Sequence, residues 1–117
     1  MANPNIVNTT EIQGRTQTFA LDVSETTLIT ASANSVYKIN VIQVANIDGA
    51  NAADVTIKYD DGVNNRPIVS TLSVPADAAV VVTDKNTGFY LEENDSIKAS
   101  AGSSADLTCM ISYERIV

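Results

Sequence analysis

The chain has 117 residues, 44% of them hydrophobic, which is the length of one domain that can bury its own core. Fourteen acidic residues against seven basic ones give a net charge of −7, and this charge disfavours binding to a nucleic-acid backbone. With no histidine and one cysteine, Ser-His and Cys-His nucleophile pairs and an internal disulfide are excluded.

The first residues are rich in Asn and Thr and predict a polar N-terminal arm, residues 1–13, ahead of a β-sandwich domain, residues 14–117. The arm carries an apolar pair, Ile6 and Val7. It is either a frayed terminus or a segment that orders against a neighbouring subunit, where burying this pair would contribute on the order of a few kcal/mol. The N-terminus has neither a basic region nor an apolar run, so we expect no secretory signal.

The first predicted strand covers residues 16–23, where Phe19, Leu21 and Val23 share one face. Residues 26–31 predict a second strand, because they are mostly β-branched.

The stretch Val36–Asp60 predicts a long β-hairpin at the centre of the fold. In its second half, apolar residues occupy every second position: Ala53, Val55, Ile57 and Tyr59. The alternation of the first half slips near Val41, which indicates either a strand that is apolar on both faces or a β-bulge. Residues 46–51, rich in Asn, Asp and Gly, predict the turn between the two halves.

A loop containing Asp61, Asn64 and Asn65 follows, and then a strand over residues 68–74 that Pro75 ends. The apolar run Ala78–Thr83 predicts a strand buried on both faces, and it is far too short to span a bilayer, so we expect no membrane contact.

The last part of the chain predicts a short strand at Phe89–Leu91, an acidic turn, and two further strands. The first of these two strands contains Ile97, Ala99 and Ala101, and the inward residues of the second are Leu107, Cys109, Ile111 and Tyr113. Short strands with turn signals about every 8 to 12 residues predict an all-β fold. We expect a single antiparallel β-sandwich of about eight strands, either jelly-roll or immunoglobulin-like.

Two acidic clusters are candidates for chemistry. Asn46, Asp48, Asn51 and Asp54 offer the hard oxygen ligands that Ca²⁺ prefers, but their spacing is not that of an EF-hand and such residues are common in turns. Glu92, Glu93 and Asp95 contain a potential carboxylate pair for glycoside hydrolysis, but few aromatic residues are available to line a sugar cleft. We therefore expect no catalytic residues, no metal and no cofactor, and a protein that is not an enzyme.

Six short stretches support a family resemblance: Val36–Asn40, Asn51–Thr56, Val74–Asp77, Asp84–Thr87, Tyr90–Ser96 and Ile111–Glu114. Together they resemble small β-sandwich virion proteins of tailed bacteriophages, especially those that infect marine cyanobacteria. The resemblance covers roughly Val36 to the C-terminus, and its motifs mark turns and strand ends.

The resemblance implies a structural protein that decorates or cements a bacteriophage capsid, located in the virion and assembled in the host cytoplasm. The implied partners are the major capsid protein or other virion subunits, and further copies of the chain in a homo-oligomer such as a trimer. We expect partner contacts at Ile6, Val7, Asp61, Asn64 and Asn65. Two alternatives remain open: a tail, neck or fibre component, and a carbohydrate-binding module in which Phe89 and Tyr90 stack on sugars.

Overall fold

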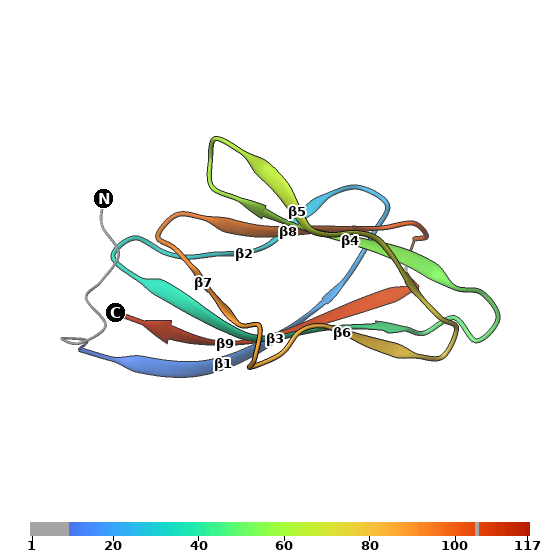
Figure 1. The fold of residues 1–117 in the computed structure, drawn as a ribbon, viewed down its shortest axis with the longest axis horizontal. Helices are drawn as coiled ribbons and strands as arrows, with labels where there is room; N and C mark the ends of the chain where they lie inside the picture. Colours follow the sequence, from blue (N-terminus) through green and yellow to red (C-terminus); the bar gives the residue numbers. More distant parts are fainter. Residues whose placement is uncertain (1–9, 105) are drawn as a thin grey trace.

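The structure, a computed structural model, describes residues 10–104 and 106–117, and these residues form two antiparallel sheets packed face to face (Figure 1). Nine strands and no helices are present in this described part. The predicted class, an all-β sandwich, is confirmed. Ile6 and Val7 lie outside the described residues, so the division of the chain at residue 13 stays a prediction.

The larger sheet, called sheet A here, has the strand order β1-β9-β3-β6, and β7 also pairs with β3. Its strands are β1 (Ile12–Ala20), β3 (Val36–Asn46), β6 (Ala79–Thr83), β7 (Phe89–Leu91) and β9 (Leu107–Ile116). Sheet B has the order β2-β8-β4-β5. Its strands are β2 (Thr26–Thr30), β4 (Ala53–Asp60), β5 (Asn65–Val74) and β8 (Ser96–Ala101).

The stretch Val36–Asp60 is not a hairpin, because β3 belongs to sheet A and β4 to sheet B. The turn-rich link between them carries the chain from one layer to the other (Figure 1). Two amphipathic strands that face each other across a core have the same alternation as two strands paired in one sheet. The short link is long enough to cross the roughly 10 Å between packed sheets.

The predicted irregularity of β3 is a β-bulge. The register of β3 against β9 shifts between Ile39 and Val41, so that Asn40 is the extra residue. The buried side of the strand accordingly moves from Ile39 to Ile42 and Val44, all of which are fully buried. The apparent slip in the apolar pattern therefore records one inserted residue.

The prediction that Ala78–Thr83 is buried on both faces is wrong. Residues 79–83 of this run form β6, which among the described strands pairs with β3 alone and is an edge strand of sheet A. Val81 is 55% exposed, and Thr83 is the buried residue of the strand. An apolar run does not distinguish a central strand from an edge strand.

The first strand is also displaced from its predicted position. β1 begins at Ile12 and ends at Ala20, whereas the prediction placed it over residues 16–23. Leu21 is buried just beyond the strand, but Val23 is 59% exposed and lies in the link to β2. β1 itself is almost entirely exposed, because it lies at the edge of sheet A and little of sheet B covers it.

The core lies between the sheets and contains the predicted inward residues of the last strand, β9, which are Leu107, Cys109, Ile111 and Tyr113, all buried. Ile97, Ala99 and Ala101 of β8 are buried in the same core. Burial raises the pKa of the Cys109 thiol to about 12, so this side chain is a core residue that stays protonated.

Candidate interaction site

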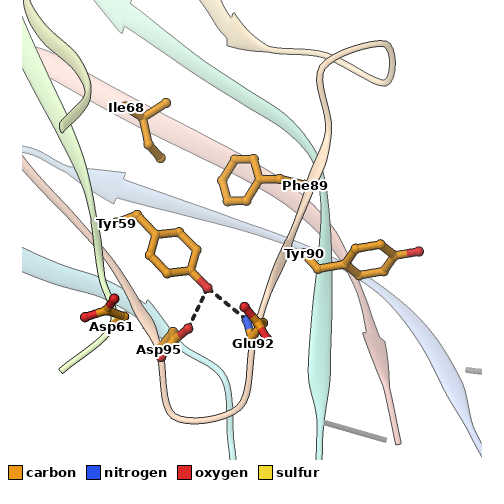
Figure 2. Close-up of a pocket in the computed structure, with 7 residues that line it drawn as sticks. All are labelled: Tyr59, Asp61, Ile68, Phe89, Tyr90, Glu92 and Asp95. Carbon is orange, nitrogen blue, oxygen red and sulfur yellow. Dashed lines mark hydrogen bonds between the residues drawn. The ribbon is translucent and has the colours of Figure 1, made fainter. Parts of the chain in front are cut away.

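A cleft of about 390 Å³ opens between the two sheets on the side where β7 faces β4 and β5. Figure 2 shows the side chains that line it: Tyr59, Asp61, Ile68, Phe89, Tyr90, Glu92 and Asp95. Four of these residues are apolar or aromatic and three are acidic, and none is basic. We call this site the acidic-aromatic cleft.

Tyr59, near the end of β4, ties the two sides of the cleft together. Its hydroxyl donates a hydrogen bond of 2.6 Å to Oδ2 of Asp95 and accepts one of 3.1 Å from the backbone N–H of Glu92 (Figure 2). Its ring lies 6.1 Å from that of Phe89, at an angle of 58°. Burial and the bond to Asp95 raise the pKa of Tyr59, so the phenol remains a donor at neutral pH.

The rim of the cleft is acidic. Asp61 follows β4, and its carboxylate accepts hydrogen bonds from the backbone N–H groups of Asn64, at 2.7 Å, and Val63, at 2.9 Å. These bonds lower the pKa of Asp61, so the carboxylate stays charged. Tyr90 is 44% exposed, and Figure 2 shows its ring directed away from Tyr59 and Phe89. An apolar floor with carboxylates at its edge suits a cationic or a hydroxyl-rich group.

The structure separates the predicted contact residues of the β4–β5 loop. Asp61 lies at the cleft, whereas the side-chain amide of Asn65 donates a hydrogen bond of 2.7 Å to Glu25. Asn64 is exposed beside Val63, which is 88% exposed at the tip of the same loop. The role of these loop residues in partner contact stays a prediction, and Ile6 and Val7 lie outside the described residues.

Sequence reasoning missed Tyr59 as a site residue because the alternation of β4 places it on the inward face. It is half-buried rather than buried, since it occupies the last inward position before the strand ends. An inward residue at the end of a strand lies where the two sheets open. The position of Tyr59 at the end of the alternating pattern was therefore the sequence signal that could have identified it as a site residue.

The other acidic cluster has a local structural role. Oδ1 of Asp48 accepts hydrogen bonds from the backbone N–H groups of Ala50, at 2.8 Å, and Asn51, at 3.4 Å. These bonds close the turn after β3. Across residues 10–104 and 106–117, no group of three or more acidic or cysteine side chains is arranged to hold a metal ion.

A second cleft, of about 330 Å³, opens on the opposite side of the sandwich, between β2 and the strands β1, β9 and β3. We call it the arginine cleft, because Arg15 and Arg115 line it. The rings of Tyr37 and Tyr113 stack there at 4.9 Å and 17°. The hydroxyl of Tyr113 donates a hydrogen bond of 3.1 Å to Gln17.

Comparison with known proteins identifies solved structures of similar fold. A chain from the acidic-stable capsid of Helicobacter pylori bacteriophage KHP30 is 7% identical, with a TM-score of 0.57, and the match covers 94% of this chain and 90% of that one. A chain from the disulfide-linked pili of Bacillus endospore appendages is 12% identical, with a TM-score of 0.51, over 91% and 85% of the two chains. At these identities, the likeness establishes a shared fold.

No protein-family model and no curated protein sequence matches the chain. The described residues also contain no helix with the length and hydropathy needed to cross a membrane.

Proposed function

We propose that this chain is a structural protein of a bacteriophage virion, which decorates or cements the capsid by binding other subunits. The observation that carries the proposal is the likeness in fold to a chain of a phage capsid, which extends over 94% of this chain. The resemblance of its turn and strand-end motifs to small phage sandwich proteins supports the same role.

The physical properties of the chain suit that role. A net charge of −7 keeps the free subunit soluble before assembly. On a capsid lattice, many weak contacts act together because each bound copy raises the effective concentration of the next contact. A rigid two-sheet core with exposed edges can present such contacts without a large conformational change.

The test is the location and copy number of the chain in particles purified from a phage that encodes it. We expect density for the sandwich at repeated lattice positions of the head and a stoichiometry that matches those positions. A low copy number at the tail or neck would favour the alternative structural role. Absence from the purified particle would refute the proposal.

The acidic-aromatic cleft favours one second candidate, a carbohydrate-binding module on the virion surface. Phe89 and Tyr59 offer aromatic faces, and Asp61 offers a hydrogen-bond acceptor at the rim. A glycan array tests this function, with Asp61→Asn as the variant that removes the charge and retains much of the shape. Glycan binding by the wild type that this variant weakens would support the module, and no binding would leave the structural role.

A further inference from the structure

The two lateral sides of the sandwich have opposite electrostatic character. In sheet A, β1 forms one edge and β6 with β7 forms the other, while β2 and β5 are the edges of sheet B. The arginine cleft lies on the side of β1 and β2, and the acidic-aromatic cleft lies on the side of β5 and β7. The two clefts therefore face in opposite directions across the width of the molecule.

The arginine cleft concentrates positive charge in an acidic chain. Two of the three arginines in the sequence line it, Arg15 from β1 and Arg115 from β9. The ion pairs within the described part of the chain are Lys58–Glu25 and Lys98–Asp60, and neither involves these arginines. Arg15 is exposed on an edge strand and its guanidinium interacts with the phenol of Tyr113, so a neighbouring molecule that binds Arg15 competes with this one contact.

The acidic-aromatic cleft fits a guanidinium group. Arg side chains stack on aromatic faces and form paired hydrogen bonds with carboxylates, and this cleft offers both kinds of surface. None of its lining residues is basic, and the nearby Arg66 acts on Asp61 from outside the lining.

The backbone edges on the two sides differ, so the contact between the sides depends on side chains. β1 pairs with β9 over nine consecutive residues without a bulge, so its outer edge is regular and contains no proline. The β5 edge is different, because its register with β4 shifts twice, it contains Pro67, and Thr71 has a φ of 49°. Bulges and prolines prevent edge-to-edge pairing, so β1 of one copy does not extend its ladder onto β5 of the next, and side chains make the contact.

We propose that copies of this chain associate side by side, with Arg15 of one copy in the acidic-aromatic cleft of the next. The contact is heterologous, since each copy uses its β1–β2 side toward one neighbour and its β5–β7 side toward the other. Such contacts continue from copy to copy into a ring or a row. This inference rests on the proposed virion role for its setting, and it names the partner as a second copy of the chain.

Sedimentation velocity on the purified full chain tests the contact, at several protein concentrations and in low and high salt. Three variants are compared with the wild type. Arg15→Glu removes the arginine side, Asp61→Asn with Tyr90→Ser removes the acidic side, and Lys85→Glu is the control for Arg15→Glu, because it makes the same charge change on an exposed loop. Thermal melts establish that each variant is folded.

We expect the wild type to associate at low salt and to dissociate as salt screens the contact. Each side variant should associate at least about tenfold more weakly, a change that corresponds to 1.4 kcal/mol, and Lys85→Glu should behave as the wild type. An equimolar mixture of Arg15→Glu with Asp61→Asn/Tyr90→Ser retains one intact pair of sides. This mixture should form a complex that stops at two chains.

A wild type that stays monomeric at low salt would overturn the inference, and so would a mixture that stays monomeric. The inference would also be overturned if either side variant associated as strongly as the wild type. Particle analysis separates this inference from the proposed function. If the chain associates with itself but no copy is found in particles, the virion role alone is refuted. If particles accept both side variants at full occupancy, the lateral contact alone is refuted.

Discussion

The hydroxyl of Tyr59 and the carboxylate of Asp95 are joined by a hydrogen bond of 2.6 Å that links β4 to the turn between β7 and β8. Asp95 directly precedes β8, which pairs with β4 in sheet B, so this bond lies on one layer. Glu92 directly follows β7 of sheet A, and its backbone N–H donates to the same hydroxyl, so this second bond joins the two layers at the mouth of the acidic-aromatic cleft. The cleft therefore depends on one phenol for its shape.

Replacing Tyr59 with Phe should lower the free energy of unfolding by about 1–3 kcal/mol, because Asp95 and the N–H of Glu92 lose a partly buried partner. Urea unfolding measures this change. Tyr90→Phe is the matched control, since Tyr90 is 44% exposed, and it should change stability by less than about 0.5 kcal/mol. Equal effects of the two substitutions would contradict the role of the Tyr59 hydroxyl.

The pH dependence of stability should differ between the wild type and Tyr59→Phe at alkaline pH. The pKa of Tyr59 is raised in the folded state from an ordinary value of 10.0, chiefly by burial. Above that value, the unfolded chain releases the phenol proton while the folded chain retains it, so folding stability falls as pH rises. Urea unfolding at a series of pH values from neutral upward should show a steeper loss in the wild type than in Tyr59→Phe, and parallel curves would contradict the raised pKa.

Replacing Ile111 with Ala should cost about 2–5 kcal/mol of stability, because the side chain is fully buried between the sheets. Thr108 lies on the same strand, half-buried on the opposite face. Thr108→Ala should cost less than about 0.5 kcal/mol. Denaturant unfolding of both variants is the measurement, and equal costs would mean that the outer face of β9 is packed as tightly as the inner face.

Asn46→Ala should destabilise the crossing between the two sheets. The buried side-chain amide of Asn46 donates to the carbonyl oxygens of Asn51, at 2.9 Å, and Val74, at 3.0 Å. Its loss leaves two carbonyl groups without this donor and should cost about 2–4 kcal/mol. Asn64→Ala, at an exposed loop position, is the control and should leave the melting temperature of the isolated protein nearly unchanged.

Deleting residues 2–9 leaves β1 intact and tests the predicted arm. We expect the isolated domain to stay within about 1 kcal/mol of the wild type in a thermal melt. If Ile6 and Val7 pack on a neighbour, the shortened chain should occupy particles less completely than the full chain. Full occupancy would contradict the anchoring role of the arm, and a large loss of stability would show that the arm belongs to the fold.

The sequence predicts the fold best where one face of a strand is buried and the other is wet. The alternation of Leu107, Cys109 and Ile111 defines the inner face of β9 correctly for this reason. The alternation could not predict which strands pair with β3, because it indicates which face of a strand is buried and carries no information on which strand lies alongside. The prediction that Val81 is buried is wrong for a related reason, because the complete strand order decides whether a strand lies at the edge of a sheet.

The candidate site was only partly predictable. Asp61 and the acidic turn containing Asp95 are recognisable as polar segments, but they are far apart in the sequence. Only the packing of β4 against β7 brings both to Tyr59. The arginine cleft likewise depends on the pairing of the first strand with the last, which places Arg15 opposite Tyr113.

That pairing has a consequence for how the protein is made. Ile12 lies opposite Ile116 in the β1–β9 ladder, so among the described strands β1 pairs with the one that is synthesised latest. Sheet A therefore cannot be completed until β9 has been synthesised, and β1 lacks this partner strand until then. Contacts between residues so distant in sequence are also slow to form. The subunit should acquire its β1 edge only after all the strands from β2 to β9 have been synthesised.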